Sequence, residues 1–141
     1  MSGDLVALVG PEELVAADLE ARLRAPGVGA VVTFVGTVRD NDAGRAVTAL
    51  VYEAHPDAGG VLAGLLADFL AAHPAVSGIA AAHRTGRLAV GEVAFVACVA
   101  AAHRREAFAA AAELVDAVKA NLPIWKLQEF ADGTREWVNA L

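Results

Sequence analysis

Two lysines, Lys119 and Lys126, lie seven residues apart near the end of the sequence, on either side of Pro123. The proline places Lys119 in the last turn of a helix predicted over 103–121 and Lys126 on a strand predicted over 124–130. Alternation along that strand puts Lys126 on the face that carries two large apolar residues, and the helical count puts Lys119 beside the apolar stripe of its helix. Two lysines in one partly dry pocket disfavour each other's charge, so we expect the pKa of at least one to fall toward neutrality. Such a lysine can act as a general acid or base, or hold an anionic intermediate.

The start of the same helix is also cationic. His103, Arg104 and Arg105 open it, and the preceding alanines offer no side-chain oxygen to cap the free N–H groups. A basic, uncapped helix start is a candidate anion pocket. A helical projection places Arg104 at the centre of the predicted buried stripe, which consists of Phe108, Ala111, Ala112, Val115, Val118 and Leu122. The structural alternative for Lys119 is that it complements the helix dipole and extends its ammonium outward to solvent.

The cysteine and the histidines indicate no further reactive centre. Cys98 lies among small apolar residues, which is typical of a buried side chain rather than of a nucleophile. His55, His73, His83 and His103 are scattered along the chain, and no nucleotide-binding, P-loop, nucleophile-elbow or HExxH motif occurs. We therefore expect no metal ion and no cofactor.

A few aromatic residues and one His-Arg pair have alternative interpretations. His83 and Arg84 precede Gly86 and are expected to organise a hairpin. Phe34 alternates onto one face of a strand, where it either lines a pocket or belongs to the core. Trp125 and Trp137 are expected to be core or interface aromatics.

The composition sets limits on the class of protein. The 141 residues are room for one domain covering 1–141. With 11 Lys and Arg against 17 Asp and Glu, the net charge of −6 argues against non-specific nucleic-acid binding. Hydrophobic residues make up 57% of the chain, but uncharged stretches such as Val93–Ala102 are shorter than the roughly 20 residues that span a bilayer. A single cysteine and no signal-peptide pattern predict a cytoplasmic protein without a membrane association.

The elements that position the lysines alternate between strands and helices. Apolar and β-branched runs predict strands over 5–9, 29–38, 46–53, 79–83, 92–101, 124–130 and 134–138. Helices are predicted over 11–25, 55–73 and 103–121, each ended by a proline or glycine signal. The polar segment 39–45 is expected to form a long hairpin tip. The pattern predicts an α+β domain of antiparallel strands and hairpins with three helices.

An ordered set of motifs resembles the catalytic (large) subunit of molybdopterin synthase. The motifs are GAVVTFVGTVR (29–39), HRTG (83–86), AHR (102–104), and Lys119 followed by Lys126 within PIWK (123–126). The similarity runs in the same order from Leu5 to Val138, and the ordered set is specific although each motif alone is weak. The resemblance implies the α/β-hammerhead fold of that family.

The resemblance also implies an activity, sulfur transfer in molybdenum-cofactor biosynthesis. Members of this family convert cyclic pyranopterin monophosphate to molybdopterin by adding two sulfurs as a dithiolene. The sulfur arrives as the thiocarboxylate on the C-terminal Gly-Gly of a small ubiquitin-like carrier subunit. The family pattern makes Lys119 and Lys126 catalytic. It assigns substrate contacts to both lysines and to Thr37, Val38, Arg39, His103, Arg104, Leu127 and Gln128.

The sequence departs from the family pattern directly after Lys126. Many relatives carry a second basic residue and then Glu, whereas this chain reads Leu127-Gln128-Glu129. Strand alternation puts Glu129 on the face opposite Lys126, so we expect Gln128 to orient the lysine by hydrogen bonding.

The length of the third helix predicts a homodimer. Arg104 and Lys119 are fifteen residues apart, which is about 22 Å along a helix and exceeds the length of a pterin phosphate. We therefore expect His103 and Arg104 of one copy to complete the pocket that holds Arg39 and both lysines of the other. The dimer would pair with two carrier subunits as a heterotetramer, as the family does.

Two other functions fit parts of this pattern. A non-catalytic dimeric module that binds an anionic metabolite or a partner's C-terminal tail would explain the basic helix start, but not two lysines converging on one pocket. A phosphate-transfer or hydrolytic enzyme is disfavoured because the sequence lacks clustered carboxylates for a metal ion.

Overall fold

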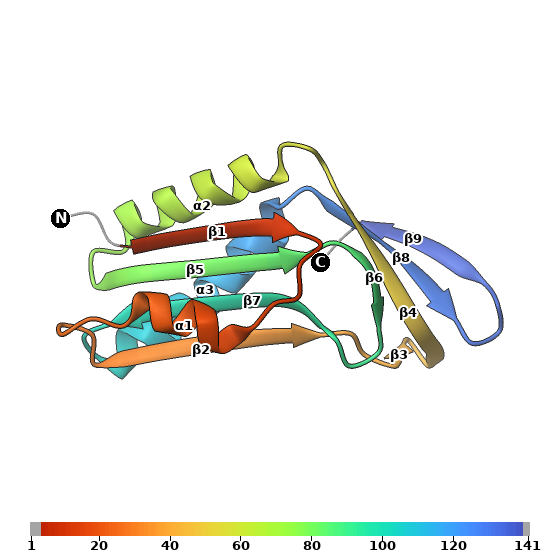
Figure 1. The fold of residues 1–141 in the computed structure, drawn as a ribbon, viewed down its shortest axis with the longest axis horizontal. Coiled ribbons are helices and arrows are strands. Elements are labelled where there is room, and N and C mark those ends of the chain that lie inside the picture. Colours follow the sequence, from red (N-terminus) through yellow and green to blue (C-terminus); the bar gives the residue numbers. More distant parts are fainter. Residues whose placement is uncertain (1–3, 140–141) are drawn as a thin grey trace.

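The chain folds into two β-sheets that meet at their ends, with helices packed against the first sheet (Figure 1). A computed structural model describes residues 4–139. The strands are β1 (Asp4–Gly10), β2 (Ala30–Thr37), β3 (Asn41–Asp42), β4 (Arg45–Ala54), β5 (Val76–Arg84), β6 (Gly86–Ala89), β7 (Val93–Ala101), β8 (Ile124–Phe130) and β9 (Arg135–Asn139). The helices within this range are α1 (Ala16–Leu23), α2 (Ala58–Ala72) and α3 (Arg104–Asn121).

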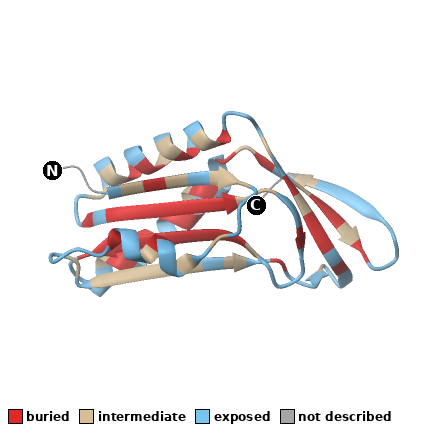
Figure 2. Ribbon diagram, in the orientation of Figure 1, coloured by how far each residue is buried: buried red, intermediate tan, exposed pale blue. Residues whose placement is uncertain are grey.

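The first sheet has the strand order β1-β5-β7-β2. Its central strands β5 and β7 are buried along almost their whole length, because helices cover both faces of the sheet (Figure 2). Helix α1 packs on one face, against β2, β5 and β7, while α2 covers β1 and β5 and α3 covers β7 and β2 on the other. The small residues of β5 and β7 let these layers approach closely, since β5 carries three consecutive alanines and β7 consists mostly of alanine and valine.

The second sheet is built around β4, which pairs with β3 and β6 and, along most of its length, with β8. Strand β9 extends the sheet beyond β8. The two-residue turn between β3 and β4 consists of Ala43 and Gly44, whose φ angles of 51° and 85° are those of a tight hairpin turn. The predicted long tip at 39–45 is therefore a short, paired hairpin.

The predicted fold class is confirmed, with one difference in strand direction. The described residues form an α+β arrangement with three helices, and every strand pair except one is antiparallel. Strands β1 and β5 are parallel, with Leu5 opposite Ile79. The chain achieves this pairing because α1, β2–β4 and α2 lie between the two strands in sequence and return the chain to the same end of the sheet.

Two predicted boundaries were wrong for reasons of long-range packing. The first helix begins at Ala16 rather than at Pro11, because the non-helical segment 11–15 connects the edge strand β1 to a helix that lies across the middle of the sheet. An extended chain covers about twice the distance per residue that a helix does. Strand β6, predicted to be only a connection, is a strand because Leu88 pairs with Leu50 on β4.

The predicted buried stripe of α3 was also rotated from the observed one. The buried side chains are Ala107, Ala110, Ala111, Leu114, Val115 and Val118. Phe108 is 64% exposed, and Arg104 lies at the exposed N-terminus rather than at the centre of the stripe. The observed stripe follows alanines that fit closely against β7, so Lys119 lies at its margin.

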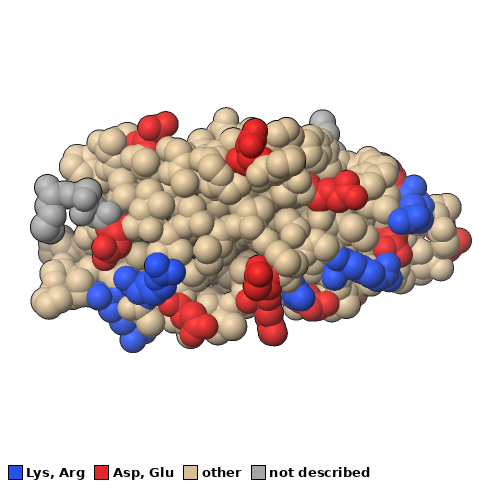
Figure 3. All heavy atoms as spheres, turned by 45° about the horizontal axis from the view of Figure 1, so that its top comes forward, with Lys and Arg blue, Asp and Glu red and all other residues tan. Residues whose placement is uncertain are grey.

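Charged side chains are dispersed over the surface. On the face shown in Figure 3, Lys and Arg occur in separate groups with Asp and Glu between them. No helix within residues 4–139 combines the length and the apolar character needed to cross a membrane.

Candidate active site

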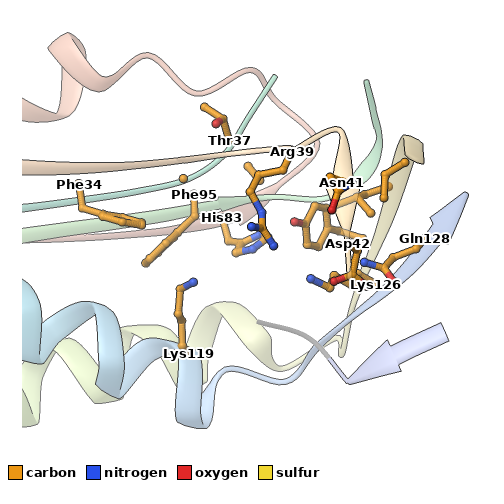
Figure 4. Close-up of a pocket in the computed structure, with 15 residues that line it drawn as sticks. Phe34, Thr37, Arg39, Asn41, Asp42, His83, Phe95, Lys119, Lys126 and Gln128 are labelled. Carbon is orange, nitrogen blue, oxygen red and sulfur yellow. The ribbon is translucent and has the colours of Figure 1, made fainter. Parts of the chain in front are cut away.

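A cavity of about 400 Å³ lies where the end of the first sheet faces the second sheet (Figure 4). The last turn of α3 reaches it from one side, and β8 and the β3–β4 hairpin reach it from the other. Its polar side chains are Thr37, Arg39, Asn41, Asp42, Tyr52, His83, Lys119, Lys126 and Gln128. Elements that are distant in sequence therefore bring three cations to one concave surface.

Both lysines of the chain line this cavity, as predicted. Lys119 comes from the last turn of α3, and Figure 4 shows its ammonium directed toward the sheet. Lys126 comes from β8, where it is the direct partner of Tyr52 on β4. Directly opposed residues of antiparallel strands point to the same side, so both face the cavity. The alternative in which Lys119 serves only the helix dipole does not account for this convergence.

Lys126 has a lowered pKa. Burial of its ammonium is the largest cause, and the charges of Lys119 and Arg39 act in the same direction. The carboxylate of Asp42 opposes them and raises the pKa. The predicted direction is thus confirmed for Lys126, but desolvation contributes more than repulsion between the two lysines.

Arg39 follows the end of β2, where the register against β7 shifts between Gly36 and Thr37. This irregularity ends the regular strand, after which Arg39 lines the cavity together with Thr37. Val38, between them, is only 3% exposed and belongs to the core. Its side chain is buried and does not face the cavity. Its backbone N–H donates to the carbonyl of Glu92 at 3.0 Å, and both contacts anchor this segment.

Along β8, residues alternate between the cavity and the opposite face. Gln128 lines the cavity and is 4% exposed, and its Oε1 has no hydrogen-bond partner among residues 4–139. Leu127 lies outside the cavity lining and is buried on the other face, contrary to the expectation that it follows Lys126 into the site. Glu129 forms a salt bridge with Arg87 of β6. Gln128 rather than Glu129 therefore shares the cavity with Lys126. The hydrogen bond by which Gln128 was expected to orient the lysine is not formed within residues 4–139, so that role stays a prediction.

A row of aromatic rings forms one wall of the cavity. The Phe34 and Phe95 centroids are 5.9 Å apart, those of Phe95 and His83 are 5.7 Å apart, and those of His83 and Tyr52 are 4.8 Å apart. The Lys119 Nζ lies 5.9 Å from the Phe34 ring centroid. An ammonium beside such a wall is partly desolvated, and a flat ligand could pack on the same surface.

His83 is neutral at this wall. Its pKa is lowered to about 4, mainly by burial; the charge of Lys119 acts in the same direction, and a hydrogen bond to the carbonyl of Arg84 opposes both. The charge of the cavity therefore comes from Arg39 and the two lysines, balanced in part by Asp42. A cavity with this balance favours an anionic ligand.

His103 and Arg104 lie at a second, open cavity of about 740 Å³ at the other end of α3. Gly29, Ala102 and Phe108 share this cavity with them. One protomer thus does not bring His103 and Arg104 together with Arg39 and the lysines, as the length of the helix predicted.

Comparison with known proteins decides the family. Residues 9–121 match the family described as MoaE protein. The chain belongs to the MoaE family. It is similar to the molybdopterin synthase catalytic subunit of Nostoc sp., with 41% identity over 79% of this chain and 68% of the relative. It is also similar to molybdopterin synthase catalytic subunit 1 of Mycobacterium tuberculosis, with 42% identity over 84% of this chain and 80% of the relative.

A solved structure agrees with the MoaE assignment. The X-ray crystal structure of molybdopterin synthase from Staphylococcus aureus superimposes with a TM-score of 0.86 at 27% identity, and the match covers 94% of this chain and 96% of that chain. The MoaE fold thus accounts for both sheets and for the junction at which the cavity lies.

Sequence reasoning missed several residues that line the cavity of this MoaE-family chain. Asn41 and Asp42 were expected to be part of an exposed tip, and His83 was expected only to organise a hairpin. Tyr52 and Phe95 received no assignment. The signal for Tyr52 was available in strand alternation, but only after β4 had been paired with β8 in the correct register.

No three His, Cys, Asp or Glu side chains gather at a possible metal site within the described part of this MoaE-family chain. Cys98 is fully buried, as expected, and its thiol lies 3.5 Å from the Thr33 hydroxyl. The side chains that line the cavity include ammonium, guanidinium and amide groups. These groups bind anions, donate protons and orient a carbonyl or thiocarboxylate.

Proposed function

We propose that this chain is the catalytic subunit of a molybdopterin synthase, a sulfurtransferase of molybdenum-cofactor biosynthesis. It converts cyclic pyranopterin monophosphate to molybdopterin by adding two sulfurs, which become the dithiolene. Residues 1–141 act as one catalytic domain, and the reaction takes place in the cytoplasm. Membership of the MoaE family and the names of its relatives support this proposal.

The observation that carries the proposal is the convergence of Arg39, Lys119 and Lys126 on one cavity. A pterin monophosphate is anionic, and three cations beside an aromatic wall match both its charge and its flat ring system. Cations that already converge on one cavity stabilise negative charge as it develops during the reaction.

The two lysines have complementary roles in this scheme. In each transfer the carrier's thiocarboxylate sulfur forms a bond to a carbon of the pterin side chain, and the C–O bond at that carbon breaks. Water then hydrolyses the resulting thioester, so the sulfur stays on the pterin and the carrier's terminus leaves as a carboxylate. Lys126, whose pKa is lowered, gives up a proton more readily than an ordinary lysine and donates it to the oxygen that leaves the pterin carbon. Lys119, on the opposite wall, holds the thiocarboxylate and the negative charge that forms during attack.

The sulfur donor is a small ubiquitin-like carrier subunit with a C-terminal Gly-Gly thiocarboxylate. The two glycines have no side chains, so such a tail can enter a narrow cavity and present its terminal group to the lysines. Each catalytic subunit would bind one carrier.

A second copy of this chain completes each site. His103 and Arg104 lie at the far end of α3 from Lys119, so they reach a substrate in the lysine cavity only from another protomer. The expected assembly is a homodimer of catalytic subunits with two carriers, a heterotetramer.

Reconstituted sulfur transfer tests this function. The purified chain is mixed with thiocarboxylated carrier and cyclic pyranopterin monophosphate, and dithiolene formation is measured. We expect Lys119→Ala to remove nearly all transfer while its thermal unfolding is nearly unchanged, because Lys119 is exposed and forms no salt bridge within residues 4–139. Arg22→Ala, which removes an exposed cation from α1, is the matched control and should remain active.

Three outcomes would contradict the proposal. Near-normal turnover by Lys119→Ala would remove the lysine from the mechanism. Binding of both ligands by the wild-type chain without turnover would indicate a non-catalytic module. Release of phosphate without dithiolene would indicate a hydrolytic or phosphate-transfer enzyme.

A further inference from the structure

The imidazole of His83 presents an unpaired acceptor at the aromatic wall. Its Nδ1 lies 2.8 Å from the Arg84 carbonyl oxygen. A carbonyl only accepts hydrogen bonds, so Nδ1 carries the proton and Nε2 carries a lone pair. Nε2 is buried, and it has no hydrogen-bond partner among residues 4–139. Leaving a buried acceptor without a donor is unfavourable, so a donor is expected to serve it during function.

The direction of this lone pair is fixed by packing. His83 is 0% exposed, meets the Tyr52 ring edge-on at 4.8 Å between centroids, and stacks beside Phe95 at 5.7 Å. The bond from Nδ1 to the Arg84 carbonyl prevents the ring from flipping. His83 also belongs to the cavity lining, so Nε2 is held in one orientation at the wall.

Among the cations of this cavity, Lys119 is the one whose charge acts on the His83 imidazole. Figure 4 shows its side chain rising from α3 toward the wall that carries Phe95 and His83. Its Nζ lies 5.9 Å from the Phe34 ring centroid, and its charge acts on the His83 imidazole. Within the described residues, the Lys119 ammonium makes no side-chain hydrogen bond and no salt bridge. The flexible Lys119 ammonium thus has three N–H groups free to donate, and the rigid His83 Nε2 lacks a donor.

We propose that His83 is a positioning residue for Lys119, and that its Nε2 accepts a hydrogen bond from Nζ and holds the ammonium against the aromatic wall. This inference rests on the proposed function, since it assigns the contact that orders a lysine of that site. Because burial keeps the imidazole neutral at pH 7, His83 orients the ammonium without adding repulsion to a cavity that already holds three cations. Its weak basicity also means that it does not remove the proton that Lys119 carries.

Nitrogen NMR of the full chain tests the contact directly, without substrate or carrier. At pH 7 we expect the His83 ring to show a protonated Nδ1 and an unprotonated Nε2. Lys119→Met should move the Nε2 resonance, because it removes the donor. Lys126→Met, which removes the other lysine of the cavity, is the matched control and should leave it in place. A protonated Nε2, or a resonance that moves only with Lys126→Met or with Arg39→Met, would overturn the proposal.

Kinetics with the reconstituted enzyme give the second test. His83→Phe keeps a flat ring but removes the acceptor, and we expect kcat to fall about tenfold, the size of a lost hydrogen bond to a charged group, with KM for the pterin nearly unchanged. His83→Gln supplies an amide oxygen as acceptor and should restore most of kcat. An equal fall in kcat in both variants, or a rise in KM with kcat unchanged, would overturn the positioning role.

The two tests separate this inference from the function on which it rests. If the wild-type chain transfers no sulfur, the proposed function fails, while the NMR comparison still decides whether His83 and Lys119 are hydrogen-bonded. If His83→Phe fails to fold, the wild-type, Lys119→Met and Lys126→Met spectra alone decide the inference.

Discussion

The carboxylate of Asp42 and the ammonium of Lys126 line the same cavity, and the charge of Asp42 opposes the lowering of the Lys126 pKa by burial. The pair joins the tip of the β3–β4 hairpin to β8, two segments more than eighty residues apart in sequence. Asp42 thus sets how readily Lys126 gives up its proton, and it reduces the positive charge available to an anionic substrate.

Replacing Asp42 by Asn should lower the pKa of Lys126 further, because the one charge that raises it is removed. If sulfur transfer needs the protonated lysine, the alkaline limb of the profile of kcat/KM against pH should move to lower pH. The titration of Lys126 can be followed separately by NMR after methylation of the two lysines. Asp40→Asn, an exposed neighbour outside the cavity lining, should change neither measurement. An upward shift would contradict the role assigned to Asp42.

Mixing two inactive variants should restore activity if each site is shared between protomers. Lys119→Ala and Arg104→Ala damage opposite ends of α3, so a mixed dimer has one site with both defects and one with neither. With random pairing after refolding together, about a quarter of the sites regain every residue. Sulfur transfer by the mixture measures this, and each variant alone is the control. No recovery despite proven exchange of protomers would contradict the shared site.

Gly29 should not tolerate a side chain. A Cβ at Gly29 would lie 2.2 Å from the carbonyl oxygen of Ala102, in the segment that leads to His103. We expect Gly29→Ala to destabilise the fold by about 1–3 kcal/mol, the usual cost of overpacking. Gly27→Ala is the matched control, because a Cβ at Gly27 would meet no atom within 4 Å. Chemical denaturation measures the stability of both variants. Equal stabilities would contradict the prediction, because they would show that the backbone at Ala102 moves away from the new methyl group at no cost.

The contact between His73 and Glu113 should make stability depend on pH. The hydrogen bond to Glu113 is the main cause that raises the His73 pKa above 6.5, and a bond to the Phe69 carbonyl adds to it. A raised pKa in the folded state stabilises the protein below pH 6.5, and this contribution is lost as pH rises through the folded value. Because the pair is exposed, the effect should be at most about 1 kcal/mol.

Denaturation at pH 5.5 and pH 8.5 measures the contribution of this pair. Glu113→Gln should reduce the stability of the protein at the lower pH more than at the higher pH. Asp68→Asn, which removes an exposed carboxylate from α2 without touching His73, is the control. A larger loss at pH 8.5 would contradict the assignment.

Sequence patterns were sufficient for the elements whose signals are local. The β-branched run in β2, the proline that ends α3 and the alternation in β8 each predicted an element close to its observed bounds. Alternation in β8 also separated Gln128 from Glu129 correctly. These features depend on neighbours along the chain, and the chain alone specifies them.

Residues positioned by distant contacts were predicted less well. Strand β6 exists because β4 offers it a partner, and the side of α3 that packs on β7 and β2 carries Ala107, Ala110 and Ala111 instead of Phe108. Trp125 and Trp137, expected in a core or an interface, are 40% and 54% exposed in one chain. Their role at an interface stays a prediction.

By itself, the sequence determined which side chains carry charge near the end of α3 and on the strand after it, because periodicity and a proline fix where Lys119 and Lys126 lie on their own elements. Only the tertiary structure decided that Asp42, His83 and Tyr52 join them, because the pairing of β4 with β8 and the meeting of the two sheets bring these residues together. Local periodicity sets the direction of each side chain, but the neighbour that it meets depends on contacts between segments far apart in the chain.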